Sequence, residues 1–304
     1  MRPTLILICA LENGKITLNY FYELHKKGKI NLLGVYTYED DAVPNKNMFV
    51  PLDNIVPPEM LKKVKHINHY IDEIEKEHPD FIFVVGWSQL VDKRIINASK
   101  KGTIGFHTSK LPKDRGRSTL AWQIAEGYKE TALTMFYLSE GIDNGDIIAQ
   151  EVIKIESNDY ISDVLFKVNK ATYNLLSTYF PLLIQGKAPR IKQDENLATY
   201  RRLRTDKDSH IDWNTNTEKI YNLIRAVSFP YPKAWTTYNE KIIKINKATI
   251  FNISLDFYLF EDPGTILGNL KGFGYLVKTK DGIIAIDDLE PKNIKLSVGE
   301  VLGK

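Results

Sequence analysis

The sequence predicts a doubly wound, mostly parallel α/β domain followed by a smaller, mostly β domain. Two observations predict the first domain. Short, continuous apolar runs are typical of strands buried on both faces of a parallel sheet, and helical segments alternate with these runs. A third observation, closely spaced turn signals between residues 235 and 290, predicts the second domain as a small open barrel. A chain of 304 residues is long enough for two cores.

The first domain is expected to span residues 1–185. Its predicted strands are 4–9, 32–36, 80–85, 102–107, 132–138 and 147–155. Its predicted helices are 16–27, 60–76, 93–99, 119–126 and 162–184. Asn13 and Gly14 are interpreted as a break, and the polar, proline-containing stretch 40–58 as a loop. Since ligands bind at the carboxyl ends of strands in such sheets, we expect Gly86, His107 and the loop after Glu140 to line one crevice.

A polar segment with one proline, residues 186–204, is interpreted as a linker. The second domain is expected to span residues 205–304. Its predicted elements are a helix at 217–226, a break at 230–232 and short strands from 235 to 290.

Composition limits the function classes. The hydrophobic content of 43% and charged content of 26% are those of an ordinary globular protein, and a net charge of +3 is too small to indicate nucleic-acid binding by itself. Cys9 is the single cysteine, so there is no disulfide framework and a cytoplasmic location is expected. The apolar run at the start is too short to span a membrane.

His107 is the first candidate catalytic residue. It ends an apolar strand and precedes the basic loop SKLPKDRG, which leaves its position fixed and its ring accessible to substrate. A histidine there can stabilise a developing oxyanion or act as a general acid or base. The alternative is a structural histidine whose hydrogen bonds are satisfied inside the fold.

Asp143 and Asp146 flank Asn144 and Gly145 in the segment EGIDNGDII. These residue types favour tight turns for backbone reasons alone, which is the simpler interpretation. The functional interpretation is that Asp143 contacts His107. The spacing does not match a calcium loop. His66 and His69 have no third ligand, so no metal site is predicted.

A basic run follows His107. Its members are Lys110, Lys113, Arg115 and Arg117. The run is either a solvated surface loop or a site for an anion such as a pyrophosphate or an RNA backbone.

Taken together, these motifs resemble the formyltransferases that use 10-formyltetrahydrofolate. That family has an Asn-x-His pair at a strand end, then Ser-Leu-Leu-Pro, two residues, Arg-Gly, and later an Asp-x-Gly loop. The corresponding stretches here are GFHTSKLPKDRG from Gly105, WQIAEG from Trp122 and GIDNGDII from Gly141. The resemblance continues in the second domain, through ATY, IDW, IRA and PYPKAW, so it covers nearly the whole chain. Glycinamide ribonucleotide formyltransferase lacks such a second domain.

The resemblance implies transfer of a formyl group from 10-formyltetrahydrofolate to a primary amine, with no metal. His107 would hold the formyl oxygen, and Asp143 would orient His107 and help move the proton. The pterin would lie between two loops. The implied folate-binding residues are Gly86, Trp87, Ser88, Gln89, Leu90, Leu138, Gly141 and Ile142. The expected contacts with the acceptor substrate are Ser109, Lys110, Lys113 and Arg115.

One position departs from the family pattern: the family asparagine falls on Gly105, which has no side chain. Loss of one oxyanion donor typically costs about 2.7–4 kcal/mol. Gln89, Ser109 and Asn144 are the candidate replacements by position. The departure also leaves open a relative that binds folate or a nucleotide sugar without turnover.

The expected acceptor is a nucleotide-linked amino sugar, such as a 4-amino-4,6-dideoxy sugar used for bacterial surface glycans. The family's tRNA enzymes insert a basic loop near the first strands, whereas residues 40–58 are acidic and apolar here. Formylation of methionyl-tRNA is the alternative. The resemblance also suggests a homodimer.

Overall fold

The computed structural model describes residues 2–251 and 260–304. The chain divides into two compact units. The first comprises Met1–Gly116, Thr131–Ile153 and Leu165–Arg201, and the second comprises Arg117–Glu130, Lys154–Val164 and Arg202–Lys304. The sequence-based division instead assigned residues 117–130 and 154–164 to the first domain. The sequence also suggests a linker at residues 186–204. In the structure, residues 186–201 of this segment pack as part of the first unit.

The first unit is built on a seven-stranded sheet in the order β3-β2-β1-β4-β5-β7-β8. These strands are β1 (Thr4–Cys9), β2 (Asn31–Tyr38), β3 (Leu61–Val64), β4 (Phe81–Val85), β5 (Gly102–His107), β7 (Glu130–Tyr137) and β8 (Ile147–Lys154). The pairs from β3 to β5 are parallel, and β7 runs antiparallel to β5. This confirms the predicted fold class.

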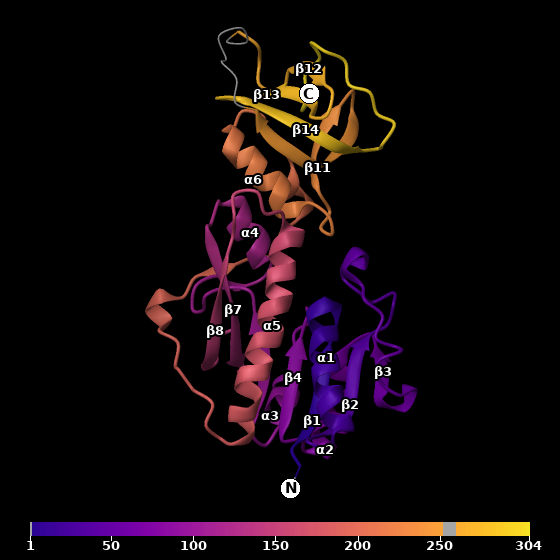
Figure 1. Cartoon of the computed structure of the whole chain (residues 1–304), viewed down its shortest axis with the longest axis vertical. Helices are drawn as coiled ribbons and strands as arrows, with labels where there is room; N and C mark the ends of the chain where they lie inside the picture. Colours follow the sequence, from indigo (N-terminus) through magenta and orange to yellow (C-terminus); the bar gives the residue numbers. More distant parts are fainter. Residues whose placement is uncertain (1, 252–259) are drawn as a thin grey trace. The chain divides into compact units, whose positions relative to one another are not determined.

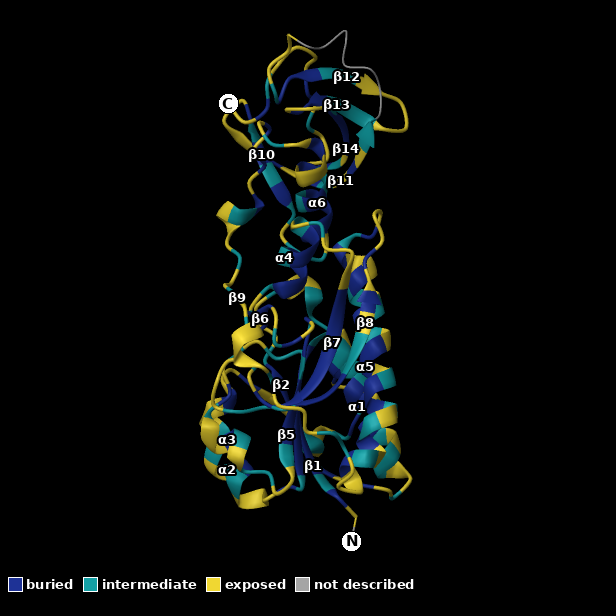
Figure 2. Ribbon diagram, turned by 90° about the vertical axis from the view of Figure 1, so that its left-hand side faces the viewer, coloured by how far each residue is buried: buried dark blue, intermediate teal, exposed yellow. Residues whose placement is uncertain are grey.

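Helices cover both faces of this sheet (Figures 1 and 2). They are α1 (Leu11–Lys26), α2 (Ile71–Glu77), α3 (Lys93–Asn97) and α5 (Ile161–Ile184). Successive side chains of β4 alternate between the faces. Phe83 packs against Phe21 of α1 and Phe180 of α5. Ile82 belongs to the core that contains Ile74 of α2 and Ile95 of α3.

The predicted break at Asn13 and Gly14 is wrong, because both residues lie inside α1, which begins at Leu11. A Cβ on Gly14 would lie 3.1 Å from the carbonyl oxygen of Val85. The glycine therefore lets α1 pack closely against the sheet, and this tertiary contact outweighs the low intrinsic helix propensity of glycine.

The predicted helix 60–76 is also wrong over most of its length. Leu61–Val64 forms β3, a short 3₁₀ segment occupies Ile67–Tyr70, and α2 begins only at Ile71. β3 pairs in parallel with β2, and Val35 lies opposite Leu61. Pairing with the exposed edge of β2 satisfies backbone groups that no local pattern reveals, so the tertiary context decides between strand and helix.

The second unit contains an antiparallel sheet in the order β10-β11-β14-β13-β12. Its strands are β10 (Ala234–Tyr238), β11 (Lys241–Phe251), β12 (Ile266–Leu270), β13 (Gly274–Lys278) and β14 (Ile283–Glu290). Two helices, α4 (Thr119–Ala125) and α6 (Thr217–Val227), pack against each other (Figure 1). The mostly β second domain is confirmed for the described residues. Residues 252–259 of the predicted strand region lie outside them.

Candidate active site

His107 is the last residue of β5, as the sequence predicts, and its side chain is buried. β5 is held on one side by β4 in parallel and on the other by β7, where His107 lies opposite Thr134. The ring Nε2 lies 2.7 Å from the main-chain carbonyl oxygen of Asp114. A carbonyl oxygen can only accept, so Nε2 carries a proton and donates it to this bond.

Asp143 lies in the loop between β7 and β8. Because β7 is antiparallel to β5, this loop begins beside Thr103, and the amide of Leu138 donates to the Thr103 carbonyl oxygen. The loop then turns back and brings Asp143 Oδ2 to 3.5 Å from His107 Nδ1. The two predicted catalytic residues therefore lie close together. His107 lies at the carboxyl end of β5, whereas Asp143 follows β7, which ends at the opposite edge of the sheet.

The Asp143 loop, residues 138–146, is tightly built. Asp143 has a positive φ of 48°. A Cβ on Gly145 would lie 1.8 Å from the Tyr137 carbonyl oxygen, so only glycine fits there. The hydroxyl of Ser139 donates to Asn144 Oδ1 at 2.5 Å. Finally, the amide of Gly116 donates to Asp143 Oδ2 at 2.8 Å, which holds the carboxylate beside the imidazole.

This arrangement defines what His107 can do. Nε2 is engaged by Asp114, while the 3.5 Å separation between Nδ1 and Asp143 is longer than a hydrogen bond. Nδ1 is thus the ring nitrogen able to exchange a proton with a bound molecule, next to a carboxylate that stabilises positive charge on the ring. An imidazole–carboxylate pair of this kind can hold or move a proton at a reacting atom.

Gly105 lies on β5 two residues before His107, where the family pattern has asparagine. A Cβ at this position would lie 2.7 Å from Cδ2 of Leu138. Leu138 packs there with Leu111, Phe136 and Ile147. A leucine side chain therefore fills the space that a larger residue at position 105 would enter.

The three residues considered as substitutes for the missing amide have different surroundings. Gln89 donates through Nε2 to the Lys65 carbonyl oxygen at 2.6 Å, and Ser109 donates to the Lys113 carbonyl oxygen at 2.8 Å. Asn144 is exposed and belongs to the Asp143 loop. Ser109 is completely buried, so neither its hydroxyl nor the engaged amide of Gln89 is well placed to donate to a substrate.

The predicted folate loop follows β4. The register pairs Val84 with Gly105, so Gly86 and His107 each lie two residues beyond the same pair. A Cβ on Gly86 would lie 2.1 Å from the Ala10 carbonyl oxygen. Trp87 stacks on Tyr38 with ring centroids 3.8 Å apart and an interplanar angle of 3°.

Further along this loop, the amide of Ser88 donates to the hydroxyl of Tyr38 at 3.0 Å. Leu90 is 84% exposed, and Ile142 of the Asp143 loop is 59% exposed, so both loops present apolar side chains to solvent. Gly141, which directly precedes Ile142, is exposed as well.

The basic run divides into exposed and buried residues. Lys110 and Lys113 are exposed, as a substrate contact requires. Arg115 is fully buried, and its guanidinium donates to Gln193, Glu195 and Tyr200 at 2.8–3.1 Å. A substrate could bind Arg115 only at the expense of these bonds. We therefore withdraw Arg115 and the buried Ser109 as substrate contacts.

The residues that the sequence did not suggest lie in the predicted linker. Gln193, Thr199 and Arg201 all bond to the segment from Asp114 to Gly116 or to the Asp143 loop. They are more than 45 residues from their partners along the chain, and no local motif marks them.

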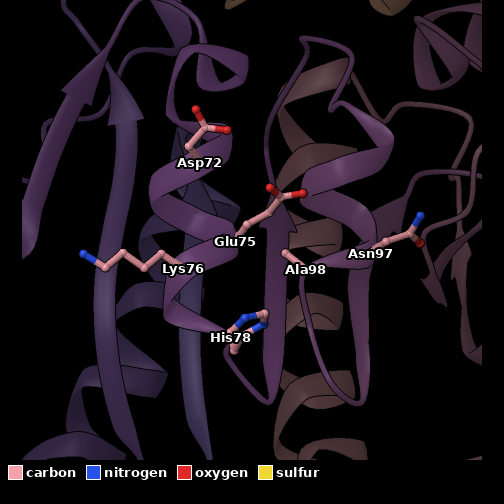
Figure 3. Close-up of a pocket in the computed structure, with 6 residues that line it drawn as sticks. All are labelled: Asp72, Glu75, Lys76, His78, Asn97 and Ala98. Atoms are coloured by element: carbon pink, nitrogen blue, oxygen red, sulfur yellow. The ribbon is translucent and has the colours of Figure 1, made fainter.

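A surface hollow of about 430 Å³ lies between α2 and α3 (Figure 3). It is lined by Asp72, Glu75, Lys76, His78, Asn97 and Ala98. These residues precede β4 and β5, so the hollow lies toward the amino ends of these strands, at the opposite edge of the sheet from His107. It is not part of the candidate active site.

Residues 2–251 and 260–304 contain no cluster of three His, Cys, Asp or Glu side chains suited to a metal ion. In the same ranges, every helix is too short or too polar to cross a bilayer.

Two family profiles match the chain: "Formyl transferase" over residues 8–179 and "Formyl transferase, C-terminal domain" over residues 204–302. A methionyl-tRNA formyltransferase from Halalkalibacterium halodurans is 33% identical over 90% of this chain and 90% of its own length. One from Clostridioides difficile is 31% identical over 83% of this chain and 79% of its own length.

Solved structures are similar at lower identity. WlaRD, a sugar 3N-formyl transferase, matches with a TM-score of 0.70 and 19% identity over 96% of this chain and 99% of its own. An N-formyltransferase from Helicobacter canadensis matches with a TM-score of 0.63 and 21% identity over 94% and 98%. HypX from Aquifex aeolicus matches with a TM-score of 0.68 and 15% identity over 95% of this chain, which spans only 44% of that protein. With both profiles matched and relatives above 30% identity over most of the chain, the protein belongs to the formyl transferase family of enzymes.

Proposed function

We propose that the protein transfers a formyl group from 10-formyltetrahydrofolate to the primary amine of a nucleotide-linked amino sugar. Family membership supports the formyl transfer. Three structural neighbours support the two substrates. HypX was solved with tetrahydrofolic acid, WlaRD with dTDP and 5-N-formyl-THF, and the Helicobacter canadensis enzyme with folinic acid and dTDP-3-aminofucose.

The two loops beside His107 suit a folate. A pterin is flat, with apolar faces and a hydrogen-bonding edge, and would need apolar side chains next to accessible backbone groups. The loop 86–90 and the Asp143 loop offer both, through the exposed side chains of Leu90 and Ile142 and the neighbouring main chain. Leu138, by contrast, is partly buried against the apolar cluster of Leu111, Phe136 and Ile147, so only part of its side chain is available to the pterin.

In the proposed mechanism, the folate supplies the formyl group and the neutral amine attacks its carbon. A bond forms between the amine nitrogen and the formyl carbon, the bond from that carbon to the folate nitrogen breaks, and one proton passes from the amine to the folate nitrogen. Because Nε2 already donates to Asp114, His107 acts in its doubly protonated form, in which Nδ1 donates a hydrogen bond to the formyl oxygen as negative charge develops there. Asp143 stabilises the charged imidazole and, directly or through a water, carries the proton.

The choice of a sugar acceptor rests on one observation about charge. β3 and the residue that follows it, Lys65, carry basic side chains that could attract an RNA backbone. Acidic residues of the stretch after β2 pair with them instead. Lys63 contacts Asp53 at 2.8 Å and Asp40 at 3.2 Å, and Lys65 lies 3.7 Å from Glu39. This region therefore lacks the uncompensated basic surface that a tRNA would need, whereas a small nucleotide needs only a few cations, such as Lys110 and Lys113.

Methionyl-tRNA is the second candidate acceptor. It is favoured by the two relatives at 31% and 33% identity, both of which are methionyl-tRNA formyltransferases. Their matches extend over 79% and 90% of their own lengths, so the resemblance includes the C-terminal domain.

Mass spectrometry of the product decides between the acceptors. The purified protein is given 10-formyltetrahydrofolate with a panel of nucleotide-linked 3-amino and 4-amino sugars, and in parallel with charged initiator tRNA. A formyl group gained by a sugar, and not gained with His107→Ala, supports the proposal. Product on tRNA alone would replace the acceptor and keep the chemistry. Folate binding without product on any acceptor would point to a non-catalytic relative. The missing side-chain amide at Gly105 would then explain the lack of turnover.

A further inference from the structure

We propose that Gln193 is a positioning residue that holds the Asp143 loop against His107, and that Arg115 serves to anchor Gln193. We call the set Arg115, Gln193 and Glu195 the linker clamp. Its three members lie in the first unit, and two of them come from the segment that the sequence presents as an ordinary polar linker.

The first half of the clamp is the contact between Gln193 and the Asp143 loop. The side-chain Nε2 of Gln193 donates to the main-chain carbonyl oxygen of Asp143 at 2.8 Å and to that of Gly145 at 2.7 Å. The two N–H groups of one amide thus tie together the two ends of the turn that carries the catalytic carboxylate. A side chain with this geometry restrains where the turn lies.

The second half of the clamp fixes Gln193 itself. Its Oε1 accepts from Arg115 Nε at 3.1 Å and from Arg115 Nη2 at 2.9 Å. The same guanidinium forms a two-point pair with Glu195, with both bonds at 2.8 Å, and reaches the hydroxyl of Tyr200 at 2.9 Å. These five bonds use every N–H of an arginine, which forms a rigid planar fork. Because the amide oxygen is held, the amide N–H groups can point only toward the loop.

The clamp is also continuous with His107. Arg115 precedes Gly116, whose amide holds Asp143 Oδ2, and follows Asp114, whose carbonyl oxygen accepts from His107 Nε2. Other residues of the predicted linker bond directly to the segment from Asp114 to Gly116. The Arg115 amide donates to the Thr199 carbonyl oxygen at 2.8 Å, and Arg201 Nε donates to Asp114 Oδ1 at 2.6 Å. One segment of linker therefore fixes both sides of the gap between His107 and Asp143.

The position of these two side chains matters because a misplacement of about 1 Å can cost about 100-fold in rate. The inference deepens the proposed function, on which its activity measurement rests. It has a second readout that does not depend on turnover, namely hydrogen exchange at the Gly116 amide, whose acceptor is the side chain that the clamp positions.

The most informative variant is Gln193→Glu. It keeps an acceptor for Arg115 but removes both donors to the Asp143 loop. We expect a lower melting temperature, because a carboxylate oxygen would face two carbonyl oxygens, together with faster exchange of the Gly116 amide and a kcat about 10- to 100-fold lower. Gln193→Ala should lose exchange protection to the same extent. Lys192→Ala, at an exposed neighbouring position, is the matched control and should resemble the wild type.

A double-mutant cycle separates positioning from any other role. In an Asp143→Ala background, the clamp has no carboxylate to position, so adding Gln193→Glu should lower kcat by less than twofold. Unchanged exchange at Gly116 in Gln193→Glu would overturn the inference, as would a full loss of rate on top of Asp143→Ala. If the wild type forms no product but the Gly116 amide still exchanges faster in Gln193→Glu, the proposed function is wrong and the positioning role of Gln193 is still supported.

Discussion

Leu138 packs against the backbone of Gly105, and its Cδ2 would be 2.7 Å from a Cβ at that position. The family pattern has an asparagine there, whose amide would face the reacting oxygen together with His107. In this protein position 105 has no side chain, and Leu138 fills the space that one would occupy.

This relationship predicts the behaviour of two variants. Gly105→Asn alone should be destabilised by about 1–3 kcal/mol, because the new side chain overlaps Leu138. Combined with Leu138→Ala, the same substitution should fit and supply an oxyanion donor, which would raise kcat by up to about 100-fold. Urea unfolding and formylation rates measure the two effects. A double variant that folds but gains no rate would mean that another group already supplies the donor.

Replacing His107 should abolish most of the activity without unfolding the protein. We expect His107→Ala to lower kcat by about 10²–10³-fold, the usual effect of removing one donor to an oxyanion. The exposed His69 provides a control, and His69→Ala should retain wild-type kcat. If the two variants had equal rates, His107 would be the structural histidine of the simpler interpretation.

The hydroxyl of Tyr38 is expected to affect folate binding through Ser88. Tyr38→Phe leaves the Ser88 amide without its partner, at a cost of about 0.5–1.5 kcal/mol. If the loop 86–90 binds the folate, KM for 10-formyltetrahydrofolate should rise about 2- to 10-fold while kcat stays the same. Tyr36→Phe is the matched control on the same strand, since the Tyr36 hydroxyl bonds to Glu73 instead. Equal KM values for both variants would place folate elsewhere.

The ion pair between Glu195 and Arg115 predicts a pH dependence of stability. The hydrogen bond from Arg115 lowers the pKa of the Glu195 carboxyl below its ordinary value of 4.5. A group with a lowered pKa stabilises the fold above that ordinary value, and the stabilisation is lost as the pH falls through the lowered pKa. The melting temperature of Glu195→Gln should therefore lie below that of the wild type at pH 7, and the two should converge in acid. A constant difference down to pH 3 would contradict this assignment.

The sequence by itself determined the features that depend on neighbouring residues. The apolar run from Gly102 to His107 predicts a buried strand with a histidine at its end, and β5 has these bounds. The turn-forming residues around Asp143 predict a tight loop, and the family motifs predict a formyl transferase. These signals are local, because strand burial and turn conformation are set by residues a few positions apart.

Only the tertiary structure decided the features that depend on distant partners. Leu61–Val64 forms a strand because its backbone pairs with the edge of β2. Gly14 lies inside a helix because that helix packs closely against the backbone of Val85. Arg115 looked like a phosphate contact, yet its partners Gln193 and Tyr200 are 78 and 85 residues away along the chain. Its role could not be predicted locally, because a guanidinium binds a carboxylate, an amide or a phosphate equally readily, and only the folded backbone determines which of these comes within reach.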